Sequence, residues 1–153
     1  MATDLYSRAA DCEIVSSRIF NSPLHQVYRA CSEPAHLLKW WGPKGFTNTF
    51  QEFDFREGGK WRFIMHGPDK GHYPNECEFI KIDEPRLIAW TRHSKPLFQM
   101  VVHFESIAGD QTKLVFRMLF DTAEECNQIK VFAPEKNEEN FDRLQEELER
   151  MSG

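Results

Sequence analysis

Two histidines flank a predicted turn and are, by residue type, well suited to hold a metal ion. His66 and His72 could face each other across the hairpin, and Glu76 or Glu78 would add a carboxylate nearby. Imidazole nitrogens and carboxylate oxygens are common zinc ligands, but zinc sites have characteristic ligand spacings. The spacing here matches none of them, so we predict no metal site and no cofactor.

Side chains suited to general acid–base catalysis are also present, namely Asp54, His66, Tyr73, Glu76 and His93. Such catalysis requires at least two groups that converge on a substrate, and the sequence does not show this. The chain contains no G-x-S-x-G, P-loop or G-x-G-x-x-G motif, and Gly58-Gly59 is typical of a hairpin turn. We therefore name no catalytic residue, and the sequence favours a binding protein over an enzyme.

Aromatic residues are the most unusual part of the composition, with 13 Phe and 4 Trp among 153 residues. Many of them lie in the segment Trp40-Trp41-Gly42-Pro43 and in the predicted strands that follow it. Such rings either fill a core or line an apolar ligand pocket, and both interpretations remain open. Because two adjacent tryptophans point in different directions, we expect one of them to lie at a pocket entrance.

Polar residues on otherwise apolar faces would orient a ligand in such a pocket. Asn137 and Asn140 lie beside the apolar stripe of the last predicted helix, while Asn75 and His93 share the parity of apolar strand residues. The alternative is that each bonds a local backbone group or faces water. The candidate ligand-binding residues are Trp40, Trp41, Phe46, Phe50, Trp61, Phe63, Met65, Asn75, Phe79, His93, Met100, Phe116, Met118, Phe132, Asn137, Asn140 and Phe141.

Length and charge narrow the classes of function. The chain fits one globular domain, and its net charge of −5 argues against nucleic acid as a partner. Residues 121–153 carry ten acidic and four basic residues, which is typical of a solvated helix face. No segment has the apolar length of an export signal or a membrane span, and the four cysteines form no C-x-x-C motif. We predict a cytoplasmic protein with reduced thiols and no membrane partner.

The predicted order of elements is one strand, two short helices, six antiparallel strands and a long helix. The strands are predicted at 12–20, 46–55, 60–66, 72–83, 86–93, 97–105 and 111–120. Successive hairpins make a meander, which needs one face covered, and the last helix is the long element available for this. We predict an α+β fold with a single domain over 12–150, preceded by a flexible tail over 1–11.

Local signals sharpen these predictions. Phe50 and Phe53 are three residues apart, so both can be buried only if the strand bulges or changes face. Asn21 or Ser22 is expected to cap the first helix, with proline in its first turn. Asp121-Thr122 is expected to cap the last helix, which Pro134 should kink or split in two.

Several motifs resemble the family named after the activator of the heat-shock ATPase. They are, in chain order, Glu33–Pro43 (EPAHLLKWWGP), Gly58–Phe63 (GGKWRF), His66–Asp69 (HGPD), Tyr73–Glu76 (YPNE) and the pattern over 137–148. The two tryptophan-containing motifs are specific when taken together. The resemblance covers nearly the whole predicted domain.

The resemblance implies a helix-grip fold, because this family (AHSA-type) is part of the START-like, or SRPBCC, superfamily. In that fold a curved sheet of about seven strands wraps a long C-terminal helix, with a cavity between them. We predict that a hydrophobic or aromatic small molecule binds in this cavity, with a volume of about a few hundred Å3 or more. The chain is expected to be a monomer or a homodimer.

Two alternatives remain open, since one fold hosts many functions. One is a protein-interaction or co-chaperone module that binds a chaperone or another protein and acts in the stress response. The eukaryotic-type activator resembles this chain only in its C-terminal domain, which counts against that role. The other alternative is a cyclase/aromatase-like enzyme, which would need two titratable groups facing the cavity.

Overall fold

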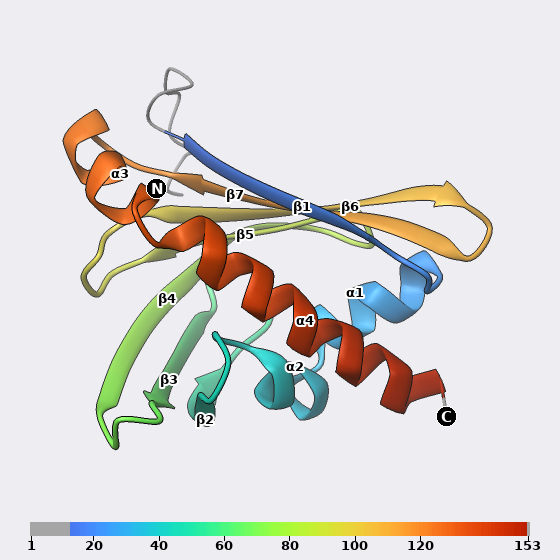
Figure 1. The fold of residues 1–153 in the computed structure, drawn as a ribbon, viewed down its shortest axis with the longest axis horizontal. Helices are drawn as coiled ribbons and strands as arrows, with labels where there is room; N and C mark the ends of the chain where they lie inside the picture. Colours follow the sequence, from blue (N-terminus) through green and yellow to red (C-terminus); the bar gives the residue numbers. More distant parts are fainter. Residues whose placement is uncertain (1–12, 153) are drawn as a thin grey trace.

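Seven antiparallel strands form one curved sheet in the computed structural model, which describes residues 13–152 (Figure 1). The strands are β1 (Glu13–Phe20), β2 (Thr47–Phe53), β3 (Lys60–His66), β4 (His72–Asp83), β5 (Leu87–Arg92), β6 (Gln99–Ala108) and β7 (Gln111–Leu119). Their order across the sheet is β1-β7-β6-β5-β4-β3-β2. The predicted meander is therefore confirmed, with β1 added beside β7. The predicted tail over 1–11 lies outside the described residues.

Four helices accompany the sheet, namely α1 (Leu24–Ser32), α2 (Pro34–Trp40), α3 (Ala123–Lys130) and α4 (Ala133–Ser152). Helix α4 lies across one face of the sheet, with α1 and α2 beside its C-terminal half and α3 at its other end (Figure 1). This arrangement is the helix-grip fold. None of the described helices is both long and apolar enough to cross a membrane.

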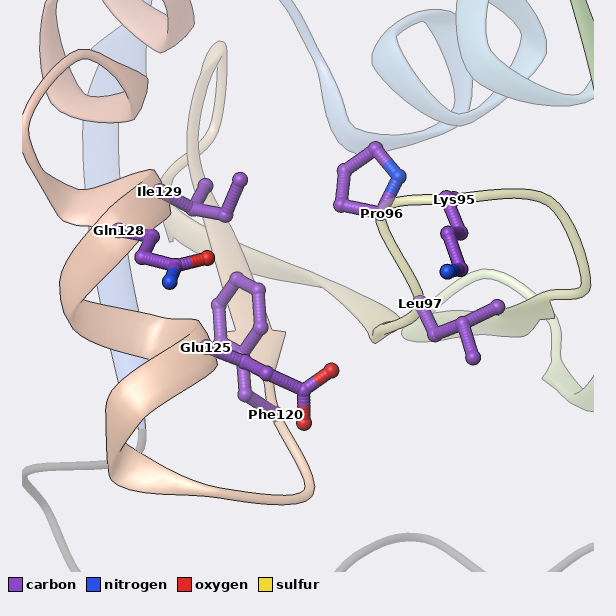
Figure 2. A pocket seen from close by; sticks show the side chains of 7 residues that line it. All are labelled: Lys95, Pro96, Leu97, Phe120, Glu125, Gln128 and Ile129. Carbon is purple, nitrogen blue, oxygen red and sulfur yellow. The ribbon is translucent and has the colours of Figure 1, made fainter.

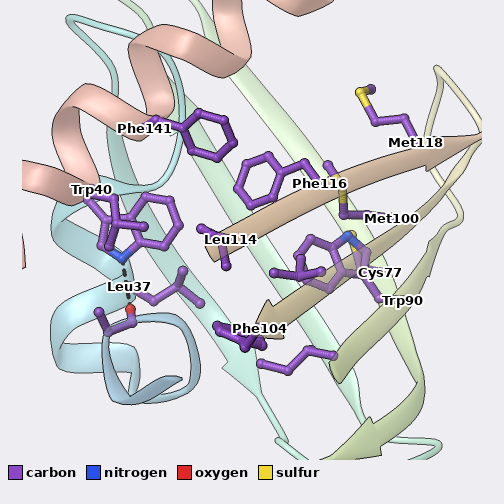
Figure 3. Close-up of a cluster of buried hydrophobic side chains, with 14 of the residues drawn as sticks. Leu37, Trp40, Cys77, Trp90, Met100, Phe104, Leu114, Phe116, Met118 and Phe141 are labelled. Atoms are coloured by element: carbon purple, nitrogen blue, oxygen red, sulfur yellow. Dashed lines mark hydrogen bonds between the residues drawn. The ribbon is translucent and has the colours of Figure 1, made fainter. Parts of the chain in front are cut away.

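Strand alternation determines which side chains meet α4. On β7, Leu114 and Phe116 are fully buried, two residues apart, as the period of a strand predicts. On α4, Phe141 and Leu144 are also fully buried. The rings of Phe116 and Phe141 lie 4.7 Å apart between their centroids (Figure 3). The core thus lies between the sheet and α4.

The irregularity predicted for β2 is present. Its pairing with β3 shifts register between Phe50 and Glu52. Phe50 and Phe53 consequently both pack on Trp61, at 5.6 and 5.9 Å between ring centroids. A regular strand would have placed one of these two rings on the opposite face.

The predicted side-chain cap of α1 is not present, and Pro23 occupies the N-cap position. Asn21 instead accepts a hydrogen bond from Gln111 Nε2 at 2.8 Å. The carbonyl of Ser22 accepts one from the Thr112 hydroxyl, also at 2.8 Å. Both residues therefore anchor the β1–α1 turn to β7, and this tertiary contact replaces the local cap.

The C-terminal helical segment is split in two, as Pro134 predicted. Thr122 caps α3 by accepting a hydrogen bond from the backbone N–H of Glu125 at 3.2 Å. Helix α3 ends at Lys130, and α4 begins at Ala133 with proline in its first turn. The two pieces can therefore differ in direction, because proline is tolerated only at a helix start.

Helix α4 holds the loop between α2 and β2 through one arginine. The guanidinium of Arg143 donates hydrogen bonds of 2.9 to 3.1 Å to the carbonyls of Lys39, Trp41, Gly42 and Pro43. Asn140 Oδ1 accepts a further bond from the backbone N–H of Gly42 at 3.2 Å. These contacts fix the backbone path of the tryptophan-containing segment.

A buried carboxylate joins α2 to α4. Glu147 Oε2 lies 2.7 Å from His36 Nδ1, and its Oε1 lies 2.8 Å from Arg150 Nη2. Burial by itself raises the pKa of Glu147, but the hydrogen bonds from His36 and Arg150 outweigh burial and lower its pKa overall. The carboxylate is therefore charged near neutral pH and paired on both sides.

Candidate functional site

The interior between the sheet and the helices is almost completely filled. Between the sheet and the helices of the described chain, a gap of about 10 Å3 remains. It is bounded by Cys31, Leu37, Trp40, Trp41, Ile88, Trp90, Val102 and Phe116. A space of this size holds at most about one water molecule. The structure thus does not show the open cavity that the resemblance implied, because aromatic side chains occupy its volume.

Most of the candidate residues do converge on this interior. Figure 3 shows Trp40, Phe116 and Phe141 directed toward one another from α2, β7 and α4. The full set that packs in or against the core is Trp40, Trp41, Phe50, Trp61, Phe63, Met65, Phe79, Met100, Phe116, Met118 and Phe141. In this structure these side chains are part of the hydrophobic core or pack against it.

Three candidates lie elsewhere. His93 is exposed beyond the end of β5, where its Nε2 lies 3.2 Å from Glu78 Oε1. Phe132 is 49% exposed in the break between α3 and α4, so it does not continue the apolar stripe of α4. Phe46 is half-buried and packs on Tyr73, at 6.1 Å between ring centroids.

The three buried asparagines are bonded within the protein. Asn137 Nδ2 donates to Ser16 Oγ at 3.1 Å, and Asn140 accepts from Gly42 as described above. Asn75 Oδ1 accepts a hydrogen bond from Arg92 Nη1. They therefore stabilise the fold, as buried polar groups usually do.

A larger pocket lies between α3 and the loop that joins β5 to β6. Its volume is about 440 Å3, and it is lined by Lys95, Pro96, Leu97, Phe120, Glu125, Gln128 and Ile129. Figure 2 shows the loop residues on one side, the α3 residues on the other and Phe120 between them. We call this the mouth pocket. Its lining combines four apolar side chains with one basic, one acidic and one amide side chain.

The loop wall of the mouth pocket is held from behind by Arg92. Its Nε donates to the carbonyl of Pro96 at 3.0 Å, and its Nη2 donates to the carbonyl of Lys95 at 3.2 Å. The guanidinium also lies over the Phe98 ring, 5.4 Å from the centroid. Burial lowers the pKa of Arg92, and no carboxylate pairs with it among the described residues. The half-buried guanidinium of Arg92 thus holds two backbone carbonyls of the loop in place, so this wall of the pocket is formed without a ligand.

Sequence reasoning missed every residue of the mouth pocket. The pocket joins two segments that are about 30 residues apart, and neither carries a motif. Leu97 was predicted to begin a strand, but β6 begins at Gln99, and Leu97 is 42% exposed in the loop before it. Two other surface hollows, of about 320 and 550 Å3, have mainly polar linings and offer less to an apolar ligand.

The histidine pair predicted at the β3–β4 hairpin does form. His66 and His72 are directly opposed, and their Nδ1 atoms are 2.7 Å apart. Thr49 Oγ1 lies 2.8 Å from His66 Nε2. Within residues 13–152, no group of three or more His, Cys, Asp or Glu side chains is arranged to hold a metal ion.

The buried thiols are unsuited to nucleophilic chemistry. Burial raises the pKa of Cys31, and it raises the pKa of Cys77 to about 12. Both therefore remain protonated near neutral pH, whereas a reactive cysteine needs a thiolate. Cys31 is the ionisable side chain among the residues that bound the interior gap. A cyclase-type mechanism would require two such groups there.

Comparison with known families agrees with the geometry. The model of the family described as "Activator of Hsp90 ATPase homolog 1-like protein" matches residues 21–149. The chain belongs to this family. No curated protein matches it significantly.

Several solved structures share the fold of this chain at low sequence identity. A protein of Nitrosomonas europaea has a TM-score of 0.85 at 21% identity, covering 95% of this chain and 99% of the other. One from Arthrobacter aurescens has a TM-score of 0.84 at 19% identity, covering 98% and 93%. An AHSA1 protein from Silicibacter pomeroyi has a TM-score of 0.73 at 18% identity, covering 91% and 99%. At these identities the likeness shows the fold alone.

Proposed function

We propose that this protein binds a small amphipathic molecule with a hydrophobic or aromatic body in the mouth pocket. The observation that carries the proposal is a pocket of about 440 Å3 whose lining combines apolar side chains with a few polar and charged ones. Ligand sites usually have volumes of about 300 to 1,000 Å3 and combine apolar walls with a few polar groups. The interior gap, at about 10 Å3, is far below that range.

The lining suggests how such a ligand would be oriented. Phe120 is fully buried beneath the pocket and supports its base, so the apolar surface that a ring or chain would contact comes from Leu97 and Ile129 on the two walls. Lys95 and Glu125 offer charges of opposite sign at the rim. A polar group on the ligand would therefore stay at the rim, where it keeps contact with water.

Preorganisation supports the proposal. Both walls are held by contacts that exist without a ligand, namely Arg92 behind the loop and the Thr122 cap on α3. A site that is already formed loses less entropy when a ligand binds than one that must be ordered.

The test begins with the molecules that copurify with the protein. The native protein is denatured, released compounds are identified by mass spectrometry, and hits are titrated together with fatty acids, flavonoids and polyketide-like rings. Binding is followed by NMR through the methyl signals of Leu97 and Ile129. The proposal predicts that these signals shift with saturation, and it fails if ligands bind without shifting them or if no compound binds.

A matched pair of variants locates the site. Ile129→Gln removes an aliphatic wall without adding charge to α3, and it should weaken binding about tenfold, since losing such a contact costs about 1.5 kcal/mol. Ile107→Gln is the control, because Ile107 is 47% exposed on β6 and does not line the mouth pocket. Equal affinity in the two variants would contradict the proposed location.

A protein-contact function is the second candidate, favoured by two exposed apolar residues. Val131 is 86% exposed and Phe132 is 49% exposed, in consecutive positions that follow Ile129 of the mouth pocket by two and three residues. Adjacent exposed apolar side chains are typical of contact surfaces. Replacing both with serine should abolish capture of a specific partner and leave small-molecule affinity intact. Unchanged partner capture would rule out this surface.

A further inference from the structure

Two imidazole rings meet at the end of the β3–β4 hairpin, on the outer face of the sheet. His66 and His72 are paired in register across the two strands, and their Nδ1 atoms lie 2.7 Å apart. Trp61 and Phe63 on β3 are buried in the core, so the alternation of the strand directs His66 away from it. His72 is exposed and His66 is half-buried, so water and dissolved ions can reach the pair.

Two ring nitrogens at this distance share one proton. In a neutral imidazole one nitrogen carries a proton and the other a lone pair, so one Nδ1 donates and the other accepts. An ion that took the place of the shared proton would find a lone pair on both Nδ1 atoms. The ring that lost its Nδ1 proton would take one from water on Nε2, so the neutral pair would bind the ion without a net loss of protons.

The separation of the two nitrogens selects the class of ion. Two ligand atoms about 2.0 Å from an ion lie about 2.8 Å apart at a bond angle of about 90°, and about 3.3 Å apart at the tetrahedral angle. The observed 2.7 Å is therefore close to the right-angle geometry of Cu(II) and Ni(II). The zinc spacings that the sequence lacks belong to tetrahedral sites with more protein ligands.

A hydroxyl on the neighbouring strand orients the ring of His66. Thr49 Oγ1, on β2, lies 2.8 Å from His66 Nε2. When the hydroxyl accepts from Nε2–H, the Nδ1 of the same ring keeps its lone pair. Histidines that bind metals usually donate their other ring N–H to an acceptor of this kind. Thr49 is thus suited to be a positioning residue for a ligand nitrogen.

The turn between the two strands is held by Asp69. Its Oδ1 accepts from the backbone N–H of Gly71 at 2.9 Å, and its Oδ2 accepts from the Tyr73 hydroxyl at 2.5 Å. The bond from Tyr73, followed by that from Gly71, lowers the pKa of Asp69, and the nearby His72 acts in the same direction. The carboxylate is therefore charged near neutral pH, and a negative charge in the same turn favours a bound cation.

We propose that His66 and His72 chelate a divalent transition ion with right-angle coordination, Cu(II) or Ni(II). The two Nδ1 atoms supply two ligands and water supplies the others, since no third His, Cys, Asp or Glu joins the pair within residues 13–152. The ion ties β3 to β4, beside the edge strand β2. This site shares no residue with the mouth pocket, so the inference does not rest on the proposed function.

Titration calorimetry with Ni2+ tests the site, because Ni2+ does not oxidise thiols. His66→Gln and His72→Gln should each bind Ni2+ at least tenfold more weakly than the wild type, since each removes one ligand. Thr49→Ala should lose about three- to tenfold, less than the roughly 10- to 100-fold typical of buried orienting groups. His93→Gln is the matched control, an exposed histidine beside the Glu78 carboxylate. Wild-type affinity in His66→Gln, or an equal loss in His93→Gln, would overturn the inference.

Electron paramagnetic resonance counts the nitrogens on the unaltered chain. With one equivalent of Cu2+ the wild-type spectrum should show the splitting of two imidazole nitrogens, and His72→Gln should show one. A merely structural role of His72 would not change this count. A wild-type spectrum with one nitrogen or none would overturn the chelate.

Thermal unfolding tests whether the ion ties the strands together. Ni2+ at about a hundredfold excess over its Kd should raise the Tm of the wild type by about 5 to 10 °C. The Tm of His66→Gln should rise far less at the same concentration. Equal shifts in the two proteins would refute binding at this hairpin. Ile129→Gln, which weakens the mouth pocket, should respond to Ni2+ as the wild type does.

Discussion

Replacement of Arg143 by alanine should destabilise the fold through the loop between α2 and β2. The guanidinium is half-buried and shares its N–H groups among four backbone carbonyls at 2.9 to 3.1 Å. Hydrogen bonds from a charged donor are worth about 1.5 to 3 kcal/mol each, and partial rehydration of an accessible loop recovers part of this. Burial lowers the pKa of Arg143, so part of the gain already offsets desolvation. We expect a net loss of about 2 to 4 kcal/mol.

Urea unfolding of Arg143→Ala measures this loss directly. The midpoint should fall while the slope stays constant, since the surface exposed on unfolding hardly changes. For a chain of this length about 3 kcal/mol corresponds to a drop in Tm of roughly 6 to 12 °C. Arg143→Lys should recover less than half, because an ammonium cannot bridge carbonyls that a planar guanidinium spans. A loss below about 0.5 kcal/mol for Arg143→Ala would refute the view that these bonds hold the loop.

Two further outcomes follow from the core and from the buried carboxylate. Phe141→Ala should cost about 3 to 5 kcal/mol in urea unfolding because its ring is fully buried, whereas Phe132→Ala should cost under about 1 kcal/mol because it is 49% exposed. Similar losses for both would contradict the assigned break between α3 and α4. The pKa of Glu147 is lowered in the folded state, so its contribution to stability is present above the unfolded pKa of about 4.3 and is lost as pH falls through the folded value. Wild-type stability should therefore fall more steeply than that of Glu147→Gln below about pH 4.5, and parallel pH profiles would contradict the pairing with His36 and Arg150.

Local patterns were sufficient to predict the elements and much of the core. The three-residue spacing of Phe50 and Phe53 predicted the β2 irregularity, since period-two geometry allows no other way to bury both rings. Thr122 and Pro134 predicted the start of α3 and the split before α4. These signals act over a few neighbouring residues, so they can be recognised in the sequence. The helix-grip fold came from the family resemblance together with the order of elements.

The aromatic interior could be predicted only in part, and the mouth pocket could not be predicted at all. The set of aromatic residues that meet inside the fold was mostly correct, because burial follows from strand parity and helix periodicity. Whether those rings line a space or fill it was undetermined, because this depends on side-chain rotamers and on the distance between α4 and the sheet. His93 was misplaced because Leu87 and Ala89, whose parity it shares, pack in a separate small cluster with Val101 and Leu119, whereas Ile88 and Trp90 face the main core. Strand β5 also ends at Arg92, one residue before His93.

The sequence by itself thus determines which segments form helices and strands, which faces of most strands point inward, and that the interior is rich in aromatic residues. The direction of Trp41 depends on a loop that Arg143 holds from 102 positions away in the chain. The mouth pocket likewise forms where the β5–β6 loop meets α3, with its loop wall gathered by Arg92. Both features arise from contacts between segments that are distant in the chain. Local sequence patterns do not predict such contacts. The filled interior and the open mouth pocket therefore emerge only once the chain is folded.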